Sequence, residues 1–181
     1  MKSELIIAGF GAAMLVATPR HAAQAAELFI GRCHMEICSW FSIEEKELLG
    51  TSSDGALFKV VTKWWESEHP GGEYEQRARR TGGEQTVSYF FCSKTRPALI
   101  WADDKGEWNA SHLAPGSPLG PSGAAESATR QYFVVCHAMS TDDDVIEEAK
   151  KFGYPPTEFP PDDRKLTRPE DFIKSPAASK P

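Results

Sequence analysis

The sequence has fewer positive than negative charges and only one long hydrophobic run. Its 181 residues carry 20 lysines and arginines against 26 aspartates and glutamates, a formal charge of −6. An acidic balance argues against a protein that binds phosphate backbones through a basic surface, and the small cluster Arg77–Arg80 is typical of a solvated loop. One apolar run near the N-terminus excludes a polytopic membrane protein. We therefore expect no nucleic-acid binding.

Several motifs that mark enzymes and cofactor proteins are also missing. No glycine-rich loop opens a helix, as phosphate and dinucleotide sites require, and neither Gly-x-Ser-x-Gly nor Cys-x-x-Cys-His occurs. His34-Met35-Glu36 matches half of the zinc-deaminase signature, but the Pro-Cys-x-x-Cys half is absent. We expect no cofactor, no metal site and no catalytic residue.

The N-terminus has the pattern of a signal peptide. Lys2 precedes the apolar run Leu5–Ala17, which is too short to cross roughly 30 Å of hydrocarbon as a helix but fits a signal-peptide core. Ala23-Gln24-Ala25 supplies the small residues that signal peptidase requires, so we predict cleavage after Ala25. An uncleaved anchoring helix is the alternative. The predicted mature protein is periplasmic or secreted, with no stable membrane insertion after cleavage.

Export favours disulfides over free thiols, and the number of cysteines is even. The four candidates are Cys33, Cys38, Cys92 and Cys136. Cys33 and Cys136 fall in the first and last predicted strands of the domain, and terminal strands of a compact sheet often lie side by side. We therefore favour Cys33–Cys136 with Cys38–Cys92. The alternative is a local Cys33–Cys38 bridge, formed across a bend at Met35-Glu36, with Cys92–Cys136.

The predicted domain spans residues 26–153 and is rich in β-structure. Aromatic and β-branched residues mark its strands, which we place at 28–37, 39–49, 56–65, 87–92, 98–101 and 130–137. Asp54-Gly55 predicts a hairpin turn between the second and third of these. The segment 43–49 also has helix propensity, but its apolar residues make a poor helical stripe, so we favour strand. The polar stretches 66–85 and 102–127 are predicted loops.

One helix and a tail complete the predicted chain. Thr141 can cap a helix, acidic residues follow it, and Gly153 is placed to end it. Residues 154–181 are rich in proline, which predicts an extended or disordered tail. The predicted fold is mainly β, a small antiparallel sheet or partly open barrel with one short C-terminal α-helix; α+β is the alternative.

Trp64 and Trp65 are the candidate partner-binding aromatics. Adjacent residues of a strand point to opposite faces, so only one of the two indoles belongs in the core. The other is either an exposed anchor for a partner or lies under a flanking loop.

These patterns favour an exported, non-catalytic binding or interaction module whose partner is an unknown protein or small molecule. Small exported β domains with disulfides more often bind than catalyse. The rival hypothesis is a metal-binding or thiol-dependent enzyme centred on Cys33, His34, Glu36 and Cys38. These residues place thiols, an imidazole and a carboxylate in one short segment.

Overall fold

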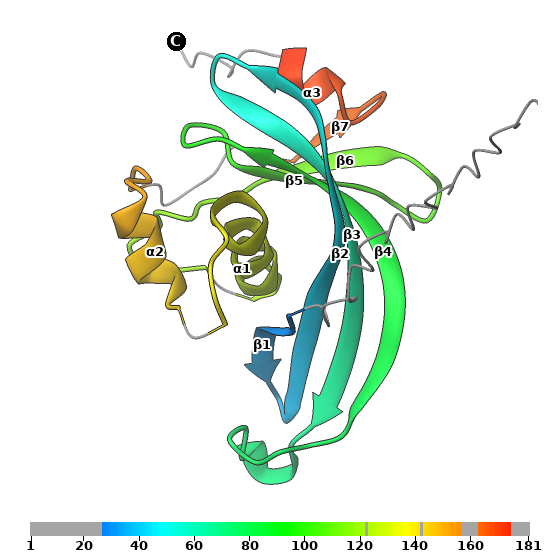
Figure 1. Cartoon of the computed structure of the whole chain (residues 1–181), viewed down its shortest axis with the longest axis vertical. Coiled ribbons are helices and arrows are strands. Elements are labelled where there is room, and N and C mark those ends of the chain that lie inside the picture. The colour runs from blue at the N-terminus through cyan, green and yellow to red at the C-terminus, as the bar shows by residue number, and fades with distance from the viewer. Residues whose placement is uncertain (1–26, 122, 142, 157–162, 175–181) are drawn as a thin grey trace, which may run out of the picture.

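The main element of the fold is one antiparallel sheet. The computed structural model describes residues 27–121, 123–141, 143–156 and 163–174; the predicted signal peptide 1–25 lies outside them. The sheet has 7 strands in the order β1-β2-β3-β4-β5-β6-β7, so each strand pairs with its neighbours in sequence and β1 and β7 form the edges (Figure 1). The strands are β1 Phe29–His34, β2 Ile37–Ser52, β3 Gly55–Glu68, β4 Arg80–Cys92, β5 Ala98–Ala102, β6 Trp108–His112 and β7 Arg164–Leu166. The predicted mainly β fold is confirmed.

The β2–β3 hairpin is the longest pairing in the sheet. It turns where Ser52 pairs with Gly55, and the Ser52 hydroxyl donates to the Asp54 carboxylate across 2.6 Å. The hairpin predicted at Asp54-Gly55 is confirmed, and so is strand over 43–49. Two register shifts in β2 and one between β3 and β4 mark β-bulges, which bend strands. The long strands curve around α1, and this defines a concave face (Figure 1).

The concave face is covered by two helices, α1 Ala124–His137 and α2 Val145–Lys151. Tyr132 and Phe133 of α1 are fully buried and pack with Val60 of β3 and Phe90 of β4. The strand predicted over 130–137 is therefore wrong. Its aromatic and β-branched residues favour strand locally, but a helical period brings the large side chains onto the sheet, and this packing overrides propensity.

The predicted short helix after α1 is confirmed as α2. Its cap is Asp144, one helical turn later than the predicted Thr141, and the Asp144 carboxylate accepts hydrogen bonds from the amides of Ile146 and Glu147. Gly153 follows the helix with φ of 69°, the left-handed conformation that glycine adopts at helix ends.

Both predicted loops contain regular structure. β4 begins at Arg80, within the predicted loop 66–85, because the long β3 strand supplies a full ladder of partners for these polar residues. The loop that precedes β4 contains a 3-10 turn at Pro70–Gly72. β6 and the first turn of α1 lie within the predicted loop 102–127.

The predicted tail is wrong for residues 163–174. Strand β7 pairs with β6, and helix α3, Asp171–Lys174, buries Phe172 completely. Phe172 packs with Leu57 and Phe91, which lie on the convex face because they alternate with Val60 and Phe90 along their strands. No proline lies between Pro161 and Pro169, so this stretch keeps the backbone donors that strand pairing needs.

Helices of the described ranges are all too short or too polar to cross a membrane.

Candidate functional site

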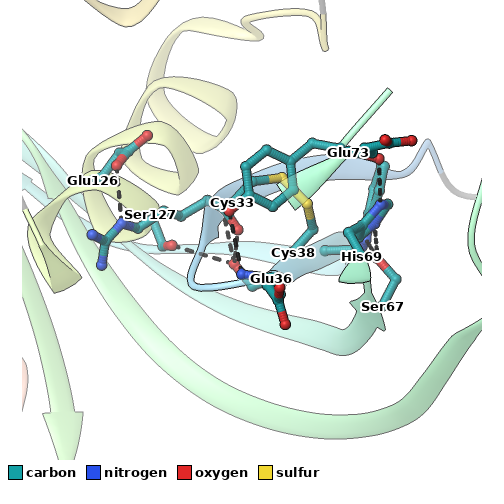
Figure 2. The surroundings of a disulfide bond; sticks show 12 residues. Cys33, Glu36, Cys38, Ser67, His69, Glu73, Glu126 and Ser127 are labelled. Atoms are coloured by element: carbon teal, nitrogen blue, oxygen red, sulfur yellow. Dashed lines mark hydrogen bonds and ion pairs between the residues drawn. A yellow bond between two sulfur atoms is a disulfide. The ribbon is translucent and has the colours of Figure 1, made fainter. Parts of the chain in front are cut away.

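The two disulfides define the geometry around the β1–β2 turn and around α1. Cys33 and Cys38 are directly opposite in the β1–β2 ladder, with Cα atoms 4.0 Å apart (Figure 2). The turn between them is Met35-Glu36, and both residues have positive φ, 49° and 65°, as tight hairpin turns require. The second disulfide joins Cys92 of β4 to Cys136 of α1, with Cα atoms 5.5 Å apart.

The favoured pairing of Cys33 with Cys136 and of Cys38 with Cys92 is therefore wrong, and the alternative is correct. The physical reason is the misassigned strand. Cys136 lies on a helix that crosses the concave face rather than on a strand beside β1, and the β1–β2 turn already brings Cys33 against Cys38.

This pairing removes the thiols on which the rival enzyme hypothesis depends. The Glu36 carboxylate accepts a hydrogen bond of 2.7 Å from the amide of Gly71, so it fastens the β3–β4 loop to the β1–β2 turn. His34 is exposed at the same turn. Over the described ranges, no three His, Cys, Asp or Glu side chains converge as a metal site would need.

A serine–histidine pair that sequence reasoning missed lies beside the disulfide. Ser67 is the second-last residue of β3. Its hydroxyl is 2.9 Å from Nε2 of His69, while Nδ1 of His69 donates to the carbonyl of Glu73 across 3.3 Å (Figure 2). The pair has the contact of a nucleophile and its base. However, Ser67 is 2 % exposed and His69 4 %, so the hydroxyl is closed to a substrate.

The buried pair instead positions a third side chain, Trp40. The indole Nε1 of Trp40 donates to the Ser67 hydroxyl across 2.7 Å. With the proton of the His69 ring on Nδ1, Nε2 accepts from Ser67, so Trp40, Ser67 and His69 all have partners for the polar atoms of this hydrogen-bond network. No local motif in the sequence predicts this hydrogen-bond network, because it depends on the pairing of β2 with β3.

Trp64 and Trp65 point to opposite faces of the sheet, and both are half-buried. Trp64 lies on the concave face opposite Phe41, with ring centroids 5.4 Å apart, and its Nε1 donates to the Thr86 hydroxyl across 3.0 Å. Trp64 is therefore engaged in packing. Trp65 lies on the convex face opposite Trp40, and within the described ranges its indole N–H makes no hydrogen bond.

A glycine bulge in β4 leaves space for Trp65. Gly82 pairs with Trp65 across the β3–β4 ladder, and the register shifts at Gly83. Both glycines have positive φ, 115° and 99°. A Cβ at Gly83 would lie 3.1 Å from Nε1 of Trp65. The indole thus lies close to bare backbone, with no side chain beside it from the paired position of β4.

A hollow of about 450 Å³ lies on the convex face at Trp65. We call it the convex hollow; it is lined by Leu28, Ser42, Glu44, Lys63, Trp65 and Arg80. The Arg80 guanidinium stacks over the Trp40 ring at 4.0 Å from its centroid. Glu44 accepts from Ser42 across 2.6 Å and from Lys63 across 2.9 Å, and these bonds lower the pKa of the Glu44 carboxyl below its usual value.

A second hollow of about 420 Å³ lies at the same bulge, lined mainly by side chains of the concave face together with Trp65, which therefore borders both hollows. We call it the concave hollow. Its charged side chains are Glu66 and Glu84, which lie beside Trp64 in the strand pairing. The two hollows therefore differ in charge, acidic on the concave face and with cationic groups on the convex face.

No family model, curated protein or solved structure matches this chain. The candidate site is therefore defined by geometry: the convex hollow, the Trp40–Arg80 stack and the Trp65 indole.

Proposed function

We propose that the protein is an exported, non-catalytic binding module whose ligand occupies the convex hollow. The observation that carries this proposal is the state of Trp65. Its ring is half-exposed beside a hollow of small-molecule size, and its N–H has no acceptor in the part of the chain that the structure describes. The Trp65 N–H is not among the buried polar atoms that lack a partner, so it is open to solvent and can donate to a ligand in place of water.

The burial of the serine–histidine pair found among the described residues supports binding rather than catalysis at this site. The two groups with catalytic contacts, Ser67 and His69, are buried and serve Trp40. The thiols of Cys33 and Cys38 are joined. We assign no catalytic role to any residue of the site.

Export is part of the same proposal. Two disulfides are typical of proteins in a non-reducing, extracytoplasmic environment, and the sequence of residues 1–25 has the pattern of a cleaved signal. N-terminal sequencing of the protein from its host is expected to begin at Ala26. A cytoplasmic protein that begins at Met1 would contradict export.

Binding at Trp65 is tested by NMR of the ¹⁵N-labelled protein, whose five tryptophans give separate indole signals. We expect at least one member of a library of anionic, cationic and neutral ring compounds to shift the Trp65 indole signal and not that of Trp64, which lines only the concave hollow, and Trp65→Leu to abolish the binding. Trp101 and Trp108 lie at β5 and β6, and their signals serve as internal controls. A library that leaves Trp65 unshifted, or shifts only the controls, would contradict the proposal.

A further inference from the structure

We infer that the ligand of the convex hollow is a carboxylate carried on a flat ring, with the ring against Trp65 and the carboxylate at Arg80. This inference rests on the proposed function, because it names the ligand class of the same site. The inference depends on which polar groups of the hollow already have hydrogen-bond partners.

The unused polar groups of the convex hollow are hydrogen-bond donors. Arg80 is exposed, and within the described residues its guanidinium takes part in the stack on Trp40 alone, so the N–H groups at its edge are open. The Trp65 N–H is open as well. Lys63 directs one N–H to Glu44 and retains two more.

The one carboxylate of the hollow already accepts a hydrogen bond at each of its oxygens. Both carboxylate oxygens of Glu44 are bonded, one by Ser42 and the other by Lys63. The Lys63–Glu44 pair is neutral overall, so Arg80 gives the hollow a net positive charge. A ligand that complements this site therefore brings acceptors and negative charge, and guanidinium binds carboxylates through two parallel hydrogen bonds.

The position of the Arg80 guanidinium is supported before a ligand arrives. Arg80 lies over the Trp40 ring, Trp40 is held by a hydrogen bond to Ser67, and Ser67 is held in turn by His69. This gives the buried serine–histidine pair a positioning role. Since a guanidinium that is already oriented loses less entropy on binding, the stack favours recognition of one planar anion.

The rest of the hollow fits a flat apolar body. Leu28 and the face of Trp65 are its apolar surfaces, and offset stacking on an indole suits a ring. The concave hollow provides a contrast within the same molecule, because Glu66 and Glu84 repel an anion there.

The inference is tested by titrating the protein with 2-naphthoate and with the neutral 2-naphthalenemethanol, followed by the tryptophan indole signals. We expect 2-naphthoate to shift the Trp65 signal and not that of Trp64, and to bind at least about tenfold more tightly than the neutral analogue. Galacturonate, a carboxylate on a puckered pyranose ring, is the third probe: weaker binding than that of 2-naphthoate supports the flat ring, and equal binding overturns it.

Charge variants show whether Arg80 is responsible. We expect Arg80→Gln to weaken 2-naphthoate binding at least about tenfold. Arg79→Gln is the matched control, because it removes the same charge from an exposed neighbour that does not line the hollow, and we expect an effect below about twofold. Unchanged Trp101 and Trp108 signals verify that both variants fold.

The outcomes separate this inference from the proposed function. If the neutral analogue binds Trp65 as tightly as 2-naphthoate, or if Arg80→Gln behaves as Arg79→Gln does, the carboxylate inference is overturned while the binding module stands. If only cationic or neutral compounds of the wider library shift Trp65, the carboxylate inference is likewise overturned and the binding module stands. If no compound shifts Trp65, both are overturned.

Discussion

A chain of four polar residues connects α1 to the sheet and to the segment after α2. The Tyr132 hydroxyl donates to the carbonyl of Ser93 across 2.9 Å and accepts from the Ser93 amide across 3.0 Å. Tyr154 lies 2.9 Å from Tyr132 and 2.6 Å from Nε2 of His137. The single hydroxyl hydrogen of Tyr132 is donated to Ser93. All contacts are therefore satisfied when Tyr154 donates to the Tyr132 hydroxyl and Nε2 of His137 donates to the Tyr154 hydroxyl.

Stability is expected to decrease as the pH falls below the ordinary range of histidine. Burial lowers the pKa of His137 and of His112 below their usual value, with nearby cations adding to the effect and Glu148 opposing it at His137. The unfolded chain therefore takes up protons first. This contribution to the free energy of unfolding is complete above about pH 6.5 and is lost as the pH falls from there towards the lowered pKa values.

Urea unfolding at pH 7.5 and at pH 5.5 measures this effect. We expect a smaller free energy of unfolding at pH 5.5, and a smaller difference between the two pH values in His137→Gln, whose side-chain amide still donates to Tyr154. The same pH dependence in His137→Gln, His112→Gln and the unaltered protein would contradict this assignment.

At the scale of elements, local sequence patterns predicted those strands and helices whose contacts lie within a few residues. The Asp54-Gly55 turn predicted the β2–β3 hairpin, and the capping signal at Thr141 with the acidic residues after it predicted α2, because the contacts that form these elements are local. Residues 130–137 failed because their helix is decided by burial against Val60 and Phe90. Of the candidate site only Trp65 was predicted, since Trp40 and Arg80 join it through strand pairing.

The two disulfides are expected to stabilise the fold unequally. Cys33–Cys38 spans a sequence separation of 5 and Cys92–Cys136 one of 44. In the chain-entropy model these loops correspond to about 2 and about 4 kcal/mol. We expect Cys92→Ala/Cys136→Ala to lower the free energy of unfolding about twice as much as Cys33→Ala/Cys38→Ala. Equal losses in urea unfolding, or a larger loss for the hairpin disulfide, would contradict this order.

At the scale of the whole molecule, the sheet has a hydrophobic core on each face. α1 and α2 cover the concave core, and the C-terminal segment covers the convex core. Arg96 anchors that segment: it is 4 % exposed, its Nε donates to Asp54 across 2.6 Å, and its guanidinium lies 5.2 Å from the Phe172 ring centroid. The sequence does not reveal this arrangement, because a four-residue helix has no periodicity and its partners lie far away in the chain.

Phe172 therefore tests whether the C-terminal segment belongs to the domain. Its ring is fully buried and packs edge-on against Phe91, with centroids 5.2 Å apart. Phe172→Ala leaves a cavity between α3 and the sheet, and such changes cost about 3–5 kcal/mol. We expect a loss of this size in the free energy of unfolding by urea. Lys174→Ala, an exposed change on the same helix, should cost less than about 0.5 kcal/mol. Equal stability of the two variants would mean that residues 163–174 do not hold the convex core together, and that the domain ends with α2.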